Sequence, residues 1–128
     1  MNTKGTIIET LGIETLELTA ERVVCTMPVN EKTRQPFGLL HGGASVVLAE
    51  TVASIGAWAG IDQENEVAMG MEINANHVRS VASGIVTAVG VPLHRGKSSA
   101  VWEIKITDEQ ERLVCISRCT IAIAPKRK

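Results

Sequence analysis

A run of small and apolar residues at positions 43–60 carries a single charged side chain, that of Glu50. A helix that is apolar on every side is normally buried in the core of a protein. The run is shorter than the ~20 residues that a bilayer requires, and Glu50 interrupts it, so we expect no membrane partner. The sequence therefore predicts a central helix packed against a sheet. Its one carboxylate must be paired, neutralised or used chemically.

The rest of the chain limits the kinds of partner. A length of 128 residues suits one domain spanning positions 1–128, and a net charge of -1 without a basic arm argues against nucleic acid. The N-terminus lacks an apolar segment of signal-peptide length, so we expect a cytoplasmic protein. The basic residues 126–128 are expected to form a solvated tail. Three cysteines are then expected to be reduced and buried: Cys25, Cys115 and Cys119.

Four segments after the apolar run have the alternation of β-strands, at residues 67–78, 85–93, 98–107 and 113–124, and a hairpin at 11–28 precedes it. In the first segment, the face predicted to be buried holds Val67, Met69, Met71, Ile73 and Ala75. In the second segment, the residues placed together are Ile85, Val89, Val91 and Leu93. In the third, the buried residues are Trp102, Ile104 and Ile106. This order predicts an α+β fold in which an antiparallel β-sheet wraps around one long central helix.

Familiar catalytic motifs are missing from the sequence. It contains no G-x-S-x-G nucleophile elbow, no P-loop and no G-x-G-x-x-G after a strand. The three histidines lack the spacing of zinc ligands, so we expect neither a metal nor a bound cofactor. Hydrolase or transferase chemistry would therefore have to rest on a carboxylate, and Glu50 is the candidate.

Gly42 offers a second part of such a site if it opens the helix. Its backbone N–H would then be unpaired at the positive end of the helix dipole, where a carbonyl oxygen gaining negative charge is stabilised. Glu50 lies eight residues further on, about 12 Å along the helix, too far to serve the same carbonyl. Two such helices packed antiparallel about a two-fold axis would bring Glu50 of one subunit toward Gly42 of the partner subunit. We therefore expect an obligate dimer.

Residues 35–50, QPFGLLHGGASVVLAE, resemble the signature of hotdog-fold acyl-CoA thioesterases. The resemblance continues through residues 72–80, EINANHVRS, to the last strand, and so covers most of the chain. The branch that it resembles contains phenylacetate-pathway thioesterases, one type of 4-hydroxybenzoyl-CoA thioesterase, and bacterial 1,4-dihydroxy-2-naphthoyl-CoA hydrolases. It implies the hotdog fold, hydrolysis of an aromatic or medium-sized acyl-CoA to free acid and coenzyme A, and a dimer or a dimer of dimers.

The resemblance also implies roles for single residues. Glu50 would attack the thioester or activate water, and the Gly42 N–H would polarise the carbonyl. Gln35 and His41 would help to position the substrate, while Ser54, at i+4 from Glu50 on one helical face, would assist the carboxylate or the water. The coenzyme A channel would be lined by Asn74, His77, Arg79, Ser80, His94, Arg95 and Gly96. From the residues alone, these basic groups fit either phosphate binding or ordinary exposed turns.

Two other functions share parts of this pattern. A hotdog enoyl-CoA hydratase needs a carboxylate and a histidine poised for water addition, which a mid-helix Glu50 preceded by His41 fits poorly. A non-catalytic acyl-CoA-binding module, as in some transcriptional regulators, normally comes with a DNA-binding segment, for which this chain has no spare length. Ligand binding without turnover would favour the binding module.

Overall fold

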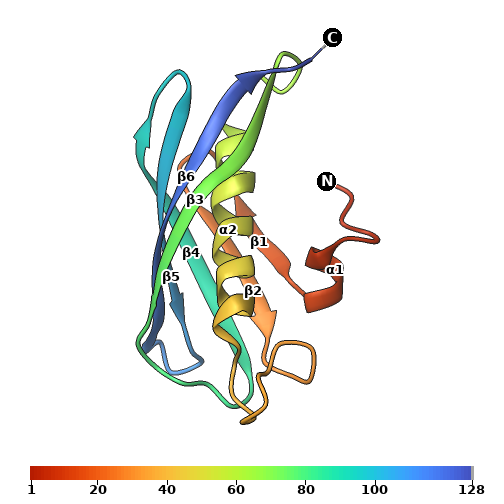
Figure 1. Cartoon of the computed structure of the whole chain (residues 1–128), viewed down its shortest axis with the longest axis vertical. Helices are drawn as coiled ribbons and strands as arrows, with labels where there is room; N and C mark the ends of the chain where they lie inside the picture. Colours follow the sequence, from red (N-terminus) through yellow and green to blue (C-terminus); the bar gives the residue numbers. More distant parts are fainter. Residues whose placement is uncertain (128) are drawn as a thin grey trace.

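The computed structural model describes residues 1–127 and shows one curved antiparallel sheet around a long helix (Figure 1). The elements follow the chain as α1 (Ile7–Leu11), β1 (Glu14–Leu18), β2 (Val23–Pro28), α2 (Gly42–Ala59), β3 (Glu66–His77), β4 (Ile85–Arg95), β5 (Ser99–Thr107) and β6 (Leu113–Pro125). Across the sheet the strand order is β1-β2-β4-β5-β6-β3. The predicted α+β architecture is confirmed, and Lys128 of the predicted tail lies outside the described residues.

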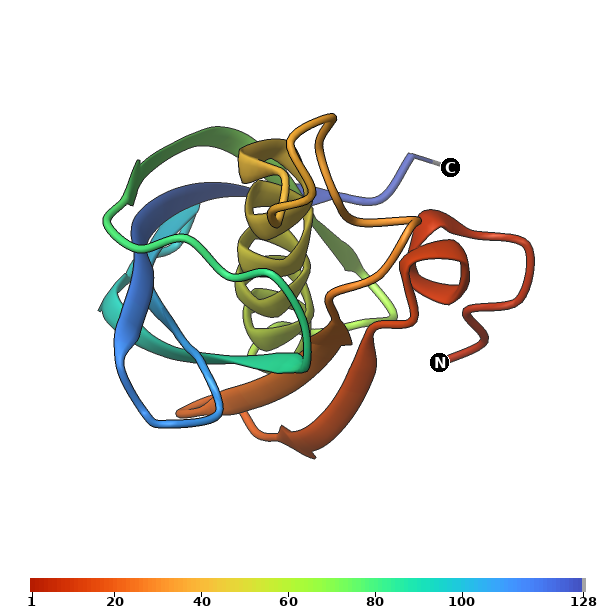
Figure 2. The same ribbon diagram turned by 90° about the horizontal axis from the view of Figure 1, so that it is seen from below.

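Helix α2 is the element that the sheet encloses, as the view from below shows (Figure 2). His41 precedes it in an extended conformation, and the ring Nδ1 accepts a hydrogen bond from the Gly43 N–H at 2.7 Å. This cap fixes the start of the helix at Gly42, as predicted. By length and composition α2 could cross a membrane, but half of it is buried within the protein. It lies in contact with all six strands, as a core helix does.

Glycines set how closely the sheet approaches α2. The indole of Trp102 on β5 lies over Gly56 of α2, where an added Cβ would come within 2.4 Å of the ring. On β4, an added Cβ at Gly90 would come within 2.4 Å of a Val52 methyl group. Contacts under 3 Å require neighbouring atoms to move, so these glycines permit the close packing. The inward face predicted for β5 is confirmed by three fully buried side chains: Trp102, Ile104 and Ile106.

Strand β3 departs from the predicted alternation because its pairing with β6 shifts between Gly70 and Glu72. A bulge adds one residue to a strand, so the core-facing side chains before it and after it do not follow one alternation. The predicted burial of Met69 and Met71 is therefore wrong, since these side chains are 54% and 66% exposed. Ile73, beyond the bulge, packs against the core as predicted.

In β4 the period was predicted correctly but the phase was not. Val86 and Ala88 are fully buried, whereas Ile85 and Leu93 of the predicted set are 47% and 50% exposed. Both faces of this strand carry apolar side chains, so hydrophobicity alone does not identify the buried face. The sheet pairing of β4 with β2 and β5 decides it.

The N-terminal hairpin and a short helix complete the fold. The hairpin predicted over residues 11–28 is confirmed as β1 and β2. Helix α1 was not predicted, because five residues are too few to show a helical period. It ends at Gly12, whose φ of 73° is the left-handed conformation typical of a helix C-terminus. Ile8 of α1 packs against the core, which holds this helix on the protein.

Candidate active site

A cleft of about 400 Å³ opens beside the first turn of α2, and we call it the N-terminal cleft. The loop before α2, the helix start and the residues that end or follow β3 supply its walls. Five of the predicted site residues line it together: Gln35, Gly42, His77, Arg79 and Ser80. The remaining lining residues are Leu39, Leu40, Ser45, Val78 and Val114. The fold thus brings together predicted site residues that lie up to 45 positions apart in the chain, from 35 to 80.

The Gly42 N–H differs from the other backbone donors of the first turn of α2 in its hydrogen bonding. The N–H groups of Ala44 and Ser45 donate to the His41 carbonyl, and that of Gly43 donates to the His41 ring. Within residues 1–127, the Gly42 N–H has no acceptor. Unpaired helix N-terminal donors favour a negatively charged oxygen. The cleft therefore contains a backbone donor suited to a polarised carbonyl.

The imidazole of His77 lies against Gly42 on the side where a Cβ would project. A Cβ at residue 42 would lie 2.9 Å from the His77 Nε2. Glycine at position 42 therefore leaves room for the ring. Gln35 is also held in place, since its side-chain oxygen accepts a hydrogen bond from the Phe37 N–H and its own N–H donates to the Leu39 carbonyl at 2.7 Å.

A second hollow, of about 300 Å³, lies along the middle of α2 beside α1, and we call it the Glu50 pocket. Glu50 and Ser54 share it, so the predicted pair is brought together on one face. Its other lining residues are Ile7, Ile8, Val47, Thr51 and Ile55. The Thr51 hydroxyl donates a hydrogen bond to the Val47 carbonyl of the same helix at 2.6 Å. The other two polar side chains of the pocket are those of Glu50 and Ser54. The pocket is therefore an apolar cavity with one carboxylate.

The cysteines do not offer an alternative nucleophile. All three are free and buried, as predicted. Burial, with smaller contributions from the Glu50 and Glu72 carboxylates, raises the pKa of the Cys119 thiol to about 12. Burial also raises the pKa values of Cys25 and Cys115. Because the thiolate is the reactive form, these side chains are unreactive near neutral pH.

The Cys119 thiol makes stability depend on pH. Its pKa rises from 9.0 to about 12 on folding, so between these values the unfolded chain holds fewer protons at this site than the folded chain. Stability is therefore lost as pH increases through this window. We expect the urea midpoint to fall more for the native chain than for Cys119→Ala between about pH 8 and about pH 10.5. Equal falls in both proteins would contradict this assignment.

Within one chain, Glu50 and Gly42 do not face the same space. The Glu50 pocket and the N-terminal cleft share no lining residue. The eight residues between the two positions correspond to about 12 Å along the helix. The single chain thus holds a carboxylate in one hollow and a backbone donor in another.

The remaining predicted coenzyme A residues lie elsewhere in the chain. Arg95 and Gly96 line a pocket of about 220 Å³ with Gly60, at the end of α2 opposite Gly42. The His94 ring lies over Gly96, with Nε2 2.8 Å from where a Cβ would be. Asn74 lines another pocket, which is formed by residues of β3, β5 and β6. In one protomer, the predicted residues form three separate groups rather than one channel.

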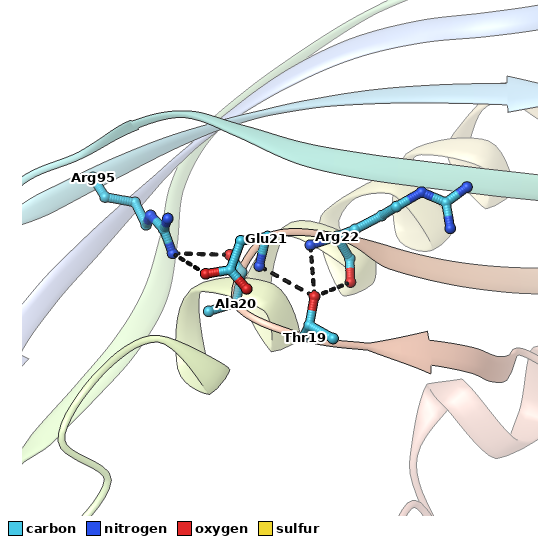
Figure 3. Close-up of polar contacts among 5 residues, drawn as sticks. All are labelled: Thr19, Ala20, Glu21, Arg22 and Arg95. Carbon is cyan, nitrogen blue, oxygen red and sulfur yellow. Dashed lines mark hydrogen bonds and ion pairs between the residues drawn. The ribbon is translucent and has the colours of Figure 1, made fainter.

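Arg95 has a structural partner that the sequence did not reveal. Its Nη1 donates to the Ala20 carbonyl at 3.1 Å and lies 3.5 Å from the Glu21 carboxylate (Figure 3). Thr19 orders the same turn, since its hydroxyl accepts the Arg22 N–H at 2.9 Å. These contacts tie the end of β4 to the β1–β2 turn across more than 70 positions of sequence. No local pattern signals a contact of that separation.

Among residues 1–127, no three or more His, Cys, Asp or Glu side chains gather in a way that could hold a metal ion. The arrangement can bind an apolar group beside a carboxylate, and a polarised oxygen at a backbone N–H.

Comparison with known proteins gives consistent matches along the chain. Residues 37–115 match the family model described as "Thioesterase superfamily". The chain is 56% identical to "Putative esterase ComA2" of Bacillus subtilis over 98% of this chain and 100% of that protein. It is 57% identical to a "1,4-dihydroxy-2-naphthoyl-CoA hydrolase" of Listeria monocytogenes over 94% and 97% of the two chains. A crystal structure of a variant of thioesterase PA1618 from Pseudomonas aeruginosa superimposes with a TM-score of 0.94 at 41% identity, covering 97% and 89%.

Proposed function

The chain belongs to the thioesterase superfamily and has its hotdog fold, and we propose that it hydrolyses an aromatic or medium-sized acyl-CoA to the free acid and coenzyme A. Family membership makes it a thioester hydrolase. The observation that carries the finer proposal is Glu50, the single charged residue of α2, set in an otherwise mainly apolar pocket. Such an isolated carboxylate next to a substrate-sized cavity is a candidate catalytic group.

The proposed chemistry uses two groups of the protein. Glu50 either attacks the thioester carbon itself, which breaks the C–S bond and leaves a mixed anhydride that water then hydrolyses, or takes a proton from the water that attacks this carbon. In the water route, the new C–O bond places negative charge on the carbonyl oxygen, which the Gly42 N–H stabilises. The C–S bond then breaks, and the coenzyme A thiolate leaves with the proton that Glu50 had accepted. Gln35 and His41 help to position the thioester, and Ser54 assists the carboxylate or the water.

We propose that two subunits build each site. Glu50 and Gly42 are separated along one helix, so Gly42 of the partner subunit supplies the donor when two α2 helices pack antiparallel. Strand β3 supports assembly, because it is an edge of the sheet and carries the exposed side chains of Met69 and Met71. Exposed edges with apolar side chains are usually covered. A dimer gives two equivalent sites, and a dimer of dimers is the larger assembly that we propose.

The apolar walls of the Glu50 pocket support an apolar acyl group. Ile7 and Ile8 of α1 face Val47 and Ile55 of α2 around this cavity. The Listeria relative is named as a hydrolase of 1,4-dihydroxy-2-naphthoyl-CoA, an aromatic thioester. We propose that the acyl part lies in the Glu50 pocket of a cytoplasmic enzyme. Coenzyme A then extends toward the N-terminal cleft that contributes the Gly42 N–H to the site. The basic residues that line this cleft are His77 and Arg79.

Release of free thiol from a panel of acyl-CoA esters tests this function. The panel contains 1,4-dihydroxy-2-naphthoyl-CoA, benzoyl-type esters and straight-chain esters of increasing length. We expect turnover, with the aromatic or medium-sized esters giving the largest kcat/KM. Because the cysteines are buried, protein without substrate should give little thiol signal. Binding of these esters without turnover of any of them would instead indicate a binding module.

A further inference from the structure

Gly70 of β3 lies against the carboxylate of Glu50. A Cβ built on Gly70 would be 2.2 Å from the Glu50 Oε2 and 3.1 Å from the carboxyl carbon. Real Cβ atoms do not make contacts this short, so the carboxylate occupies the volume that any other residue at position 70 would need. The backbone of β3 is therefore one wall of the space that holds Glu50.

Space, rather than backbone conformation, accounts for glycine at this position. Gly70 is not among the residues with positive φ, so alanine can adopt its backbone conformation. Within the interior of a strand, glycine weakens the strand unless another group approaches closely. A β-bulge follows directly, between Gly70 and Glu72. Bulges often redirect a strand beside functional groups, so this one also supports a close approach at Gly70. The approaching group here is the Glu50 side chain.

We infer that Gly70 is a positioning residue, which holds the Glu50 carboxylate in its reactive place by leaving room for it against β3. This inference rests on the proposed role of Glu50. A methyl group at position 70 would push the carboxylate toward the open pocket. The displaced atoms are the end of a flexible side chain, so the fold tolerates the change while the geometry of the reaction does not. A displacement of about 1 Å at a reacting group can cost on the order of 100-fold in rate.

The test is a double-mutant cycle of native protein, Gly70→Ala, Glu50→Ala and the double variant. Gly60→Ala is the matched control, because a Cβ at Gly60 meets its nearest atom at an ordinary 3.5 Å. In native protein, we expect Gly70→Ala to lower kcat about 10-fold or more, because the methyl group displaces the carboxylate from its reactive place. In Glu50→Ala, which lacks the displaced carboxylate, Gly70→Ala should have no further effect on kcat. Gly60→Ala should behave as native.

Thermal unfolding of the same four proteins separates the possible results. If Gly70→Ala lowers the Tm of the native protein or stops it from folding, the same substitution should do neither in Glu50→Ala. The inference is overturned if Gly70→Ala keeps native kcat, or if it lowers kcat or Tm equally with and without the Glu50 side chain. If the native protein hydrolyses no ester, the proposed function fails, and the Tm coupling still decides whether Gly70 makes room for the carboxylate.

Discussion

Glu50→Gln is expected to reduce kcat for the best thioester by about 100-fold or more, because glutamine keeps the size of the side chain but can neither accept a proton nor act as a carboxylate nucleophile. The change removes one charge from a half-buried helix position, so we expect the fold to persist. Thiol release under saturating substrate measures kcat directly. Circular dichroism and the Tm establish that the variant is folded.

Glu72→Gln is the matched control for this prediction. Both carboxylates lie close enough to Cys119 to raise the pKa of its thiol, but the Glu72 side chain is exposed and accepts a hydrogen bond from Asn74. We expect Glu72→Gln to retain native kcat. If Glu50→Gln kept activity within about tenfold of native, a group other than Glu50 would have to provide the base or nucleophile.

Gly42→Pro is expected to lower kcat by about 100-fold to 1,000-fold relative to Gly42→Ala, the range seen when one oxyanion donor is removed. Proline lacks the N–H and is well tolerated at the first position of a helix. The residue before a proline prefers an extended backbone, and His41 already has φ of -71° and ψ of 131°. The substitution therefore removes the donor without breaking α2.

The alanine variant controls for the added side chain. Alanine and proline both place a Cβ against the His77 ring, 2.9 Å from Nε2, so both variants share that disturbance. Only the proline variant loses the N–H. Equal kcat values for the two variants, with Tm values showing that both are folded, would exclude the Gly42 N–H as the oxyanion donor.

The sequence predicted the parts of this protein that depend on local pattern. The apolar run around Glu50 has one reasonable place in a small α+β protein, and α2 occupies it from Gly42 to Ala59. The succession of strands along the chain and the inward face of β5 also followed from alternation, since Glu103 and Lys105 mark the outward face of that strand. The pairing of Glu50 with Ser54 followed from helix geometry, and both line one pocket.

The features that sequence reasoning missed depend on contacts between distant segments. No residue type marks the bulge that turns Met69 and Met71 outward, because it arises where β3 pairs with β6. Gly70 of β3 leaves space for the side chain of Glu50, which lies on α2, 20 positions earlier in the chain. Only the folded arrangement shows why glycine lies at that strand position. The Arg95 contact with the β1–β2 turn is of the same kind.

Helix α1 has a consequence for how enzymes of this design can diversify. It forms a wall of the Glu50 pocket, yet it belongs to the first residues of the chain and pairs with no strand. Changes at Ile7 or Ile8 would reshape the acyl cavity while the sheet register, α2 and the proposed catalytic groups stay as they are. Under the proposed function, this wall of the acyl cavity and the catalytic groups are thus inherited through different stretches of the gene, whereas the facing wall, Val47 and Ile55, lies on α2 with Glu50. Selection can alter the first stretch without rebuilding the second.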